Sequence, residues 1–91
     1  MNDYKLELKL INKSIRINIY RNLENETEEK QTYYAQVTTK QFHINIYNNS
    51  RKLIIDFLTN ENLAKIERIE KFYEYSTYIL TLTPKALLRL I

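Results

Sequence analysis

Apolar and polar residues alternate strictly in two neighbouring segments near the N-terminus. Every second position is Tyr or Leu in residues 4–10 and Ile in residues 15–20. A period of two is typical of a half-buried β-strand. Between the segments, Asn12-Lys13 can close a two-residue turn, because Asn tolerates the left-handed backbone conformation. We therefore expect a hairpin whose aliphatic faces pair from Leu10 opposite Ile15 outward.

A second pair of alternating segments follows at residues 33–37 and 42–47. Joined near Thr39-Lys40, they predict a second hairpin with Val37 opposite Phe42. Thr-Lys is poor turn chemistry, so the connection can also be longer or bulged. After a turn at residues 48–50, residues 51–58 favour a fifth strand because they are short and β-branched, with a buried helical turn as the alternative.

The spacing of apolar residues changes over residues 60–74. Leu63, Ile66, Ile69, Phe72 and Tyr73 recur at intervals of about three to four, which predicts a helix. Residues 76–83 alternate again and predict a sixth strand. Thr83-Pro84 then opens a short C-terminal helix over residues 85–91.

This order of elements predicts a single α+β domain spanning residues 1–91. Its core is one mostly antiparallel sheet of about five to six strands, beginning with two hairpins. The helix near 60–74 and the short C-terminal helix cover one face of that sheet.

Composition narrows the possible chemistry. The chain has no Gly and no Cys, and Asn, Ile, Lys and Tyr are frequent, a bias that indicates an AT-rich genome. Without Gly, glycine-built nucleotide-binding loops are absent. Without Cys, disulfides and thiolate sites are absent. No apolar stretch reaches the ~18 residues of a membrane span, and we expect a cytoplasmic protein.

No set of residues predicts catalysis, a metal site or a cofactor. His43 is the only His, and the predicted register places it diagonal to Asp56. A His-Asp pair can orient a base, but it needs a nucleophile within reach. Ser14, Ser50 and Ser76 all lie at turns or strand ends. We therefore expect a protein that is not an enzyme and that carries neither metal nor cofactor.

The chain is acidic between the two predicted hairpins. Residues 22–30 hold four glutamates: Glu24, Glu26, Glu28 and Glu29. Such a loop can enter an Arg-rich pocket of a protein partner. Our leading hypothesis is a small non-enzymatic binding protein, an accessory protein of a phage or mobile element. It would inhibit or regulate a host protein complex, such as a defence nuclease, by occlusion through these glutamates.

The outward face of the hairpins supports an alternative hypothesis, a single-stranded nucleic-acid-binding module. This face combines basic and aromatic side chains: Lys9, Arg16, Tyr20, Tyr34, His43 and Tyr47. Bases can stack on rings while cations contact phosphates. Two cations, Lys9 and Arg16, are predicted to lie opposite each other, which costs stability and points to an anionic partner. Tyr is also a good solvent-facing strand residue, so an ordinary exposed sheet explains the same pattern.

The C-terminal segment is apolar nearly all round. Its large aliphatic residues are Leu87, Leu88, Leu90 and Ile91. One helix face against the sheet cannot cover all of them. A homodimer contact through these residues is therefore expected.

Overall fold

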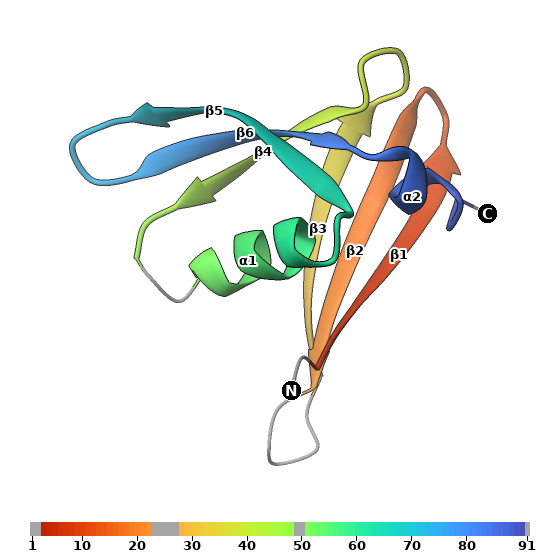
Figure 1. Cartoon of the computed structure of the whole chain (residues 1–91), viewed down its shortest axis with the longest axis horizontal. Coiled ribbons are helices and arrows are strands. Elements are labelled where there is room, and N and C mark those ends of the chain that lie inside the picture. Colours follow the sequence, from red (N-terminus) through yellow and green to blue (C-terminus); the bar gives the residue numbers. More distant parts are fainter. Residues whose placement is uncertain (1–2, 23–27, 49–50, 91) are drawn as a thin grey trace.

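Two three-stranded antiparallel sheets and two short helices build the molecule (Figure 1). The computed structural model describes residues 3–22, 28–48 and 51–90. In chain order the elements are β1 (Tyr4–Ile11), β2 (Ser14–Asn22), β3 (Glu28–Gln36), β4 (Gln41–Ile46), α1 (Lys52–Asn60), β5 (Ala64–Lys71), β6 (Ser76–Leu82) and α2 (Pro84–Leu87). The α+β class is confirmed.

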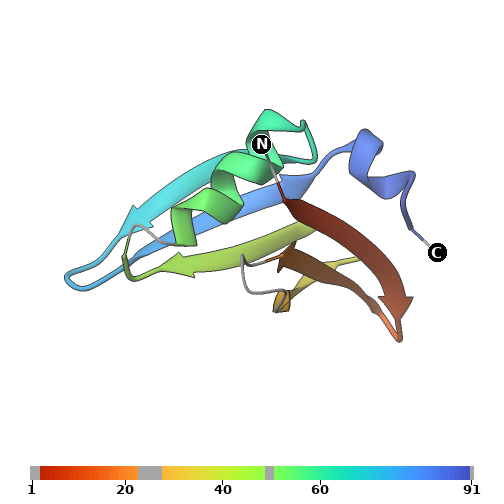
Figure 2. The same cartoon turned by 90° about the horizontal axis from the view of Figure 1, so that it is seen from below.

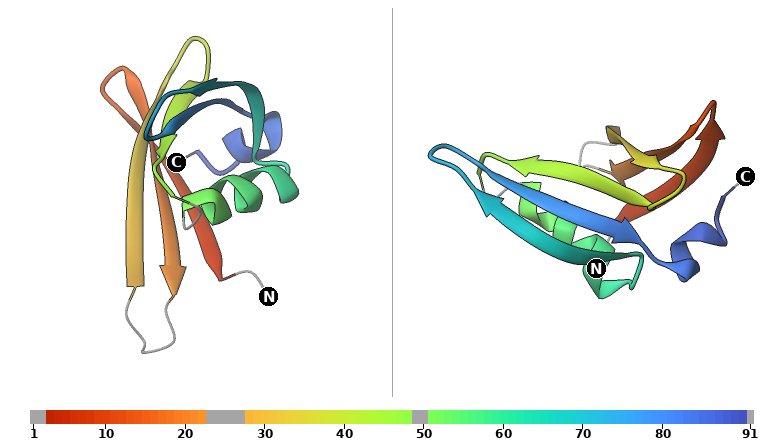
Figure 3. Two further views of the ribbon diagram at one scale, coloured as in Figure 1. Left: turned by 90° about the vertical axis from the view of Figure 1, so that its left-hand side faces the viewer. Right: turned by 90° about the horizontal axis from the view of Figure 1, so that it is seen from above.

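The prediction of a single sheet is wrong. The first sheet has the strand order β1-β2-β3 and the second has β4-β6-β5. The strands of the two sheets run steeply across one another, and α1 lies in the angle between them (Figures 1 and 3). Figure 2 shows α1 against one face of the second sheet. Both sheets and α1 contribute to one hydrophobic core, which includes Leu8, Ile17, Phe42, Leu58 and Leu80.

The hairpin of β1 and β2 is confirmed with its predicted register. Leu10 lies opposite Ile15 and is half exposed, whereas the next alternate residues, Leu8 and Leu6 on β1 and Ile17 and Ile19 on β2, are buried in the core. Asn12 adopts the left-handed conformation with φ 55°, which Asn accepts more readily than most residues do. Local alternation and one turn residue were sufficient to predict this register, because the two strands are neighbours in both sequence and space.

The predicted pairing of β3 with β4 is wrong. β3 pairs with β2, so that Ala35 lies opposite Ile15, and β4 pairs with β6. A tight turn separates the strands, with Lys40 at φ 64° and its N–H donating to Gln36 O at 2.8 Å. The chain therefore leaves the first sheet at this turn and enters the second. Phe42 still points into the core as predicted, but its partner is Leu80 on β6.

Residues 51–58 lie mostly in a helix, so the fifth strand predicted there is wrong and the helical alternative is correct. In α1 the buried residues are Ile54, Ile55, Phe57 and Leu58, the spacing of one helix face. The helix ends in a Schellman motif, in which Leu63 N–H donates to Leu58 O. Asn62 takes the left-handed position of this motif with φ 56°, the place that Gly usually occupies.

The helix predicted over residues 60–74 is also wrong, because this segment forms β5. The pairing register with β6 shifts at a bulge just after Ile66. Ile66 lies opposite Leu80 and Ile69 opposite Tyr78, and these two partners share one face of β6. The bulge thereby lets apolar residues three positions apart share a face. A bulged strand and a helix can thus carry the same apolar spacing.

The charged side chains of β5 pair as they do in a strand. Arg68 Nε lies 3.3 Å from Glu70 Oε2, and Lys65 Nζ lies 3.9 Å from Glu67 Oε1. Each pair is two residues apart and not four, the spacing at which strand side chains share a face. Both pairs are largely exposed, so they contribute little to stability.

The last strand and helix were predicted nearly correctly. In β6, Leu80 and Leu82 belong to the core. Thr83 caps α2, since its Oγ1 accepts the Ala86 N–H at 3.2 Å. The helix is shorter than predicted, and Leu90 forms a parallel bridge with Leu8 on β1. Within the described residues, neither helix is long and apolar enough to cross a membrane.

Candidate functional site

The turn that joins β5 to β6 carries a cluster of aromatic rings. A hydrogen bond from Phe72 N–H to Tyr75 O, 2.8 Å long, closes this turn. The rings of Phe72 and Tyr75 stack with their centroids 4.9 Å apart, and the Tyr47 ring lies 5.2 Å from that of Tyr75. We call Phe72, Tyr73 and Tyr75 the aromatic tip, with Tyr47 packed against it.

The aromatic tip is open to solvent, at the end of the second sheet that projects away from the first (Figure 1). Tyr73 is 99% exposed and Phe72 is 51% exposed. The tip borders a hollow of about 310 Å³ that Lys52 of α1 also lines. Large exposed rings grouped together mark contact surfaces more often than isolated ones do.

Sequence reasoning missed the aromatic tip because residues 60–74 were assigned to a helix. In that helix, Phe72 and Tyr73 would belong to the apolar face. The available signal was the short segment 72–75 between two runs that can both form strands. Read as a hairpin, these two runs leave the aromatic residues at the turn, where no core can cover them.

The predicted acidic cluster is only partly within the described residues. Glu24 and Glu26 lie outside them. Glu28 and Glu29 are the first residues of β3 and are exposed. Glu29 lies opposite Arg21 in the ladder between β2 and β3. Two of the four glutamates therefore sit on a strand, whereas the prediction placed all four in a loop.

The basic and aromatic residues of the first sheet do lie together. Lys9 is opposite Arg16, and Arg16 is opposite Tyr34 on its other side. These three residues form a row across all three strands, on the face that points away from the core, and we call it the basic row. The Nε atom of Arg16 is buried and has no hydrogen-bond partner among the residues that the structure describes. Tyr34 is 59% exposed.

Next to the basic row, a polar network fixes the neighbouring row of the same face. Asn18 donates to Glu7 Oε1 at 3.1 Å and accepts from Thr32 Oγ1 at 2.7 Å. Tyr20 donates to the same Glu7 oxygen at 3.2 Å. The hydrogen bond from Asn18 is the main reason that the pKa of Glu7 lies below its ordinary value. The Tyr20 hydroxyl is therefore engaged within the sheet.

The two remaining residues of the predicted nucleic-acid face, His43 and Tyr47, lie on β4 and just after it. A hollow of about 300 Å³ brings His43 together with Tyr34. A second hollow of about 560 Å³ continues past His43 to Tyr47 and to Arg51 at the start of α1. We call these two adjoining hollows the β4 groove. It lies between β3 and β4, which are edge strands of different sheets.

One wall of the β4 groove contains a partly buried tyrosine, Tyr33. Burial raises the pKa of the Tyr33 hydroxyl, and the charge and hydrogen bond of Arg51 partly oppose that rise. The Arg51 guanidinium is therefore close to the hydroxyl of Tyr33. This contact connects Arg51, the residue before α1, to β3 across the groove.

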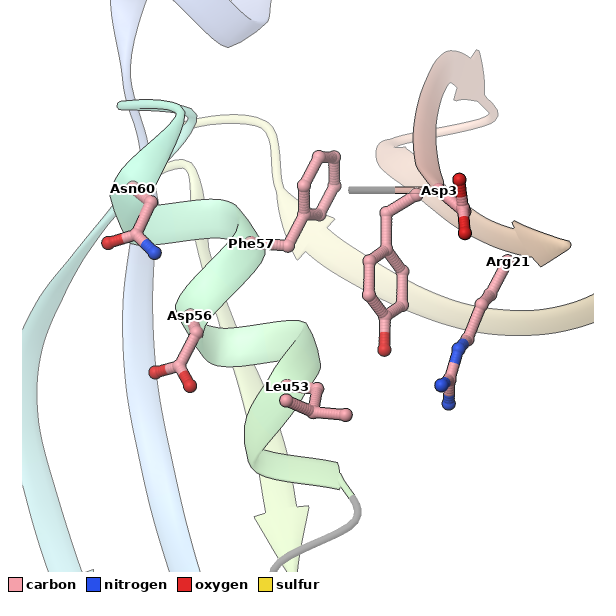
Figure 4. A pocket seen from close by; sticks show the side chains of 7 residues that line it. Asp3, Arg21, Leu53, Asp56, Phe57 and Asn60 are labelled. Atoms are coloured by element: carbon pink, nitrogen blue, oxygen red, sulfur yellow. The ribbon is translucent and has the colours of Figure 1, made fainter. Parts of the chain in front are cut away.

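The predicted pairing of His43 with Asp56 depended on a strand that does not form. Asp56 lies on α1 and lines a different pocket, of about 390 Å³, together with Asp3 and Arg21 (Figure 4). In that pocket the Tyr4 ring stacks on Phe57 with centroids 5.3 Å apart. The Arg21 guanidinium lies over Tyr4, 5.5 Å from its centroid. Asp56 and His43 thus face different hollows.

At the C-terminus, the aliphatic residues split between core and surface. Leu87 packs against the core, whereas Leu88 and Leu90 are exposed. Ile91 lies outside the described residues. Two of the three described residues of the predicted dimer contact are therefore exposed.

Across the described ranges, no group of three or more His, Cys, Asp or Glu side chains is placed to hold a metal ion. Comparison of the chain with protein-family models, with curated proteins and with solved structures found no match.

Proposed function

We propose that this chain is a small cytoplasmic binding protein, without catalytic activity of its own, that recognises another protein. The observation that supports this best is the aromatic tip. Tyr73 and Phe72 lie exposed on a hairpin turn, away from the core that the two sheets and α1 already build. Leaving such rings in water has a cost, which a partner surface would remove.

Aromatic residues suit this role for a physical reason. Tyr and Phe bury a large area on binding and lose little conformational entropy, because each side chain has only two rotatable bonds. They are also common among the residues that dominate binding energy. The stacking of Phe72 on Tyr75 also holds the tip in one arrangement before a partner arrives. Such preorganisation lowers the entropy cost of binding.

The acidic cluster is the second contact in this proposal. Glu28 and Glu29 are exposed at the start of β3, and Glu24 and Glu26 precede them in sequence. Carboxylates at this place would draw a basic partner surface and raise the rate of association. The partner we favour is a host protein complex, such as a defence nuclease, that an accessory protein of a phage or mobile element would occlude.

A capture experiment tests the aromatic tip directly. Tagged wild-type protein and the Tyr73→Ser variant are incubated with lysate of the native host, and retained proteins are identified. We expect a partner that the wild type retains and that Tyr73→Ser loses by tenfold or more. Leu10→Ser is the matched control, because it removes a half-exposed apolar side chain on the first sheet. Equal retention by both variants would remove the aromatic tip from the proposal.

The acidic cluster needs its own test with the partner so identified. Changing Glu24, Glu26, Glu28 and Glu29 to Gln should slow association and lessen its dependence on salt. Surface plasmon resonance at low and moderate salt measures both. An unchanged association rate would exclude the glutamates as a contact.

A further inference from the structure

A second surface collects cations and exposed rings along one continuous path. The basic row crosses the first sheet from Lys9 through Arg16 to Tyr34. Tyr34 and His43 line the same hollow, and His43 and Arg51 line the next one. The basic row and the β4 groove therefore join at Tyr34 and His43, although they belong to different sheets.

The charges along this path are unbalanced. Among the described residues no carboxylate lines either hollow of the β4 groove, although the charge of Glu29 reaches the Tyr33 hydroxyl in its wall. Lys9 and Arg16 face each other across the ladder, where like charges repel. The buried Arg16 Nε has no partner within the described chain, and a buried donor without an acceptor costs stability. Glu7 lies close enough to Arg16 for their charges to interact, but it accepts the hydrogen bonds of Asn18 and Tyr20.

We propose that the basic row and the β4 groove together bind a single strand of nucleic acid. Lys9, Arg16 and Arg51 would contact phosphates. Unpaired bases would stack on the exposed faces of Tyr34 and His43. Single-stranded nucleic acid is favoured over a duplex, because bases can stack on protein side chains only when they are not paired with another base.

The dimensions of the path suit a short segment of single-stranded nucleic acid. Crossing from β1 to β3 spans about 10 Å, and the length of β4 adds about 20 Å. Sites of this kind on small β folds take from about 4 nucleotides upward. The amide side chains of Gln31 and Asn45, which also line the groove, can hydrogen-bond to base edges.

This assignment changes the membership of the face expected from the sequence. Tyr20 drops out, because its hydroxyl is held by Glu7 and the row of Glu7, Asn18 and Thr32 separates it from the basic row. Arg51 and Tyr33 enter, because α1 begins beside β3 and β4. The inference does not depend on the aromatic tip, which the path approaches only at Tyr47.

Fluorescence anisotropy tests this proposal with a labelled oligothymidylate of about twelve nucleotides and the same sequence annealed to its complement. We expect the single strand to bind more tightly than the duplex. With three phosphate contacts, raising salt from about 25 to about 150 mM should weaken binding by about 40-fold. Tyr73→Ser should bind the oligonucleotide like the wild type, which separates this proposal from the protein-binding one.

The variants locate the site. Arg16→Gln and Tyr34→Ser should each weaken binding by about tenfold. Arg68→Gln, on the opposite edge strand of the second sheet, removes the same charge outside the path and should leave binding unchanged. Circular dichroism verifies folding, and Tyr34→Ser should leave the fold intact because the Tyr34 side chain is mostly exposed. Absence of binding at about 25 mM salt overturns the proposal, as does an equal loss in Arg68→Gln.

Discussion

Lys9 lies directly opposite Arg16 in the ladder between β1 and β2, so two cations stand side by side on the outward face of the first sheet. Neither residue belongs to the hydrophobic core. Placing like charges in facing strand positions lowers the stability of a sheet. An anion bound between the two side chains would relieve this repulsion, which is why the pair anchors the proposed nucleic-acid path.

Removing one charge of this pair should stabilise the protein. We expect Lys9→Gln to raise the free energy of unfolding by about 0.2–1 kcal/mol at low salt. The gain should shrink as salt screens the repulsion. Urea denaturation at two salt concentrations measures both effects. Lys5→Gln is the matched control, because Lys5 lies opposite Tyr20, and a lower stability of Lys9→Gln than of this control would contradict the idea.

The end of α1 offers a test of how a chain without Gly makes tight turns. Asn62 holds the left-handed position at φ 56°. We expect Asn62→Ala to lower the free energy of unfolding by about 1 kcal/mol, because Ala resists that conformation. Asn62→Gly should cost less than about 0.5 kcal/mol. Asn60→Ala, inside the same helix, is the control for loss of an amide, and a cost equal to that of Asn62→Ala would refute the backbone explanation.

The network around Asn18 makes stability depend on pH through Glu7. The pKa of Glu7 is lower in the folded chain than its ordinary value of 4.5, chiefly because Asn18 donates a hydrogen bond to the carboxylate. A group whose folded pKa is depressed stabilises the fold at pH values above its unfolded pKa. That stabilisation is lost as pH falls from about 4.5 through the folded pKa.

Two variants make this pH dependence measurable. Glu7→Gln should unfold with a flatter pH profile than the wild type between about pH 5 and pH 3. Asn18→Ala should move the Glu7 pKa back toward its ordinary value, which carbon NMR of the side-chain carboxyl follows. A Glu7 that titrates at or above its ordinary value in the wild type would show that the network does not hold the charge.

The parts of the fold that sequence predicted are those decided by local pattern. The β1–β2 register follows from strict alternation and one Asn at the turn, so Leu10 and Ile15 were placed correctly. The pairing of β3 was missed because alternation reveals which face of a strand is buried and not which strand lies beside it. Ala35 can pack beside Ile15 of β2 as well as beside Ile44 of β4, so the alternation does not decide between these two strands.

The misread segment at residues 60–74 had a further consequence for the candidate site. A single bulge after Ile66 brought Ile66 and Ile69 onto one face of a strand, and this spacing resembled a helix. Phe72 and Tyr73 then appeared to be core residues, although they lie at the exposed turn of a hairpin. One extra residue in β5 therefore made the sequence pattern resemble a helix, and the aromatic residues of the turn were not predicted to be exposed.

Whether the aromatic tip serves binding or folding is itself open to measurement. Tyr73 is almost fully exposed, so we expect Tyr73→Ser to change the free energy of unfolding by less than about 0.5 kcal/mol. Ile44→Ala, in the core, should cost about 2–5 kcal/mol under the same conditions. Tyr75 stacks on Phe72 and also contacts the Tyr47 ring, and Tyr75→Ser should fall between the two. A loss at Tyr73 as large as that at Ile44 would mean that the fold needs this ring, and the exposed tip would no longer require a partner to explain it.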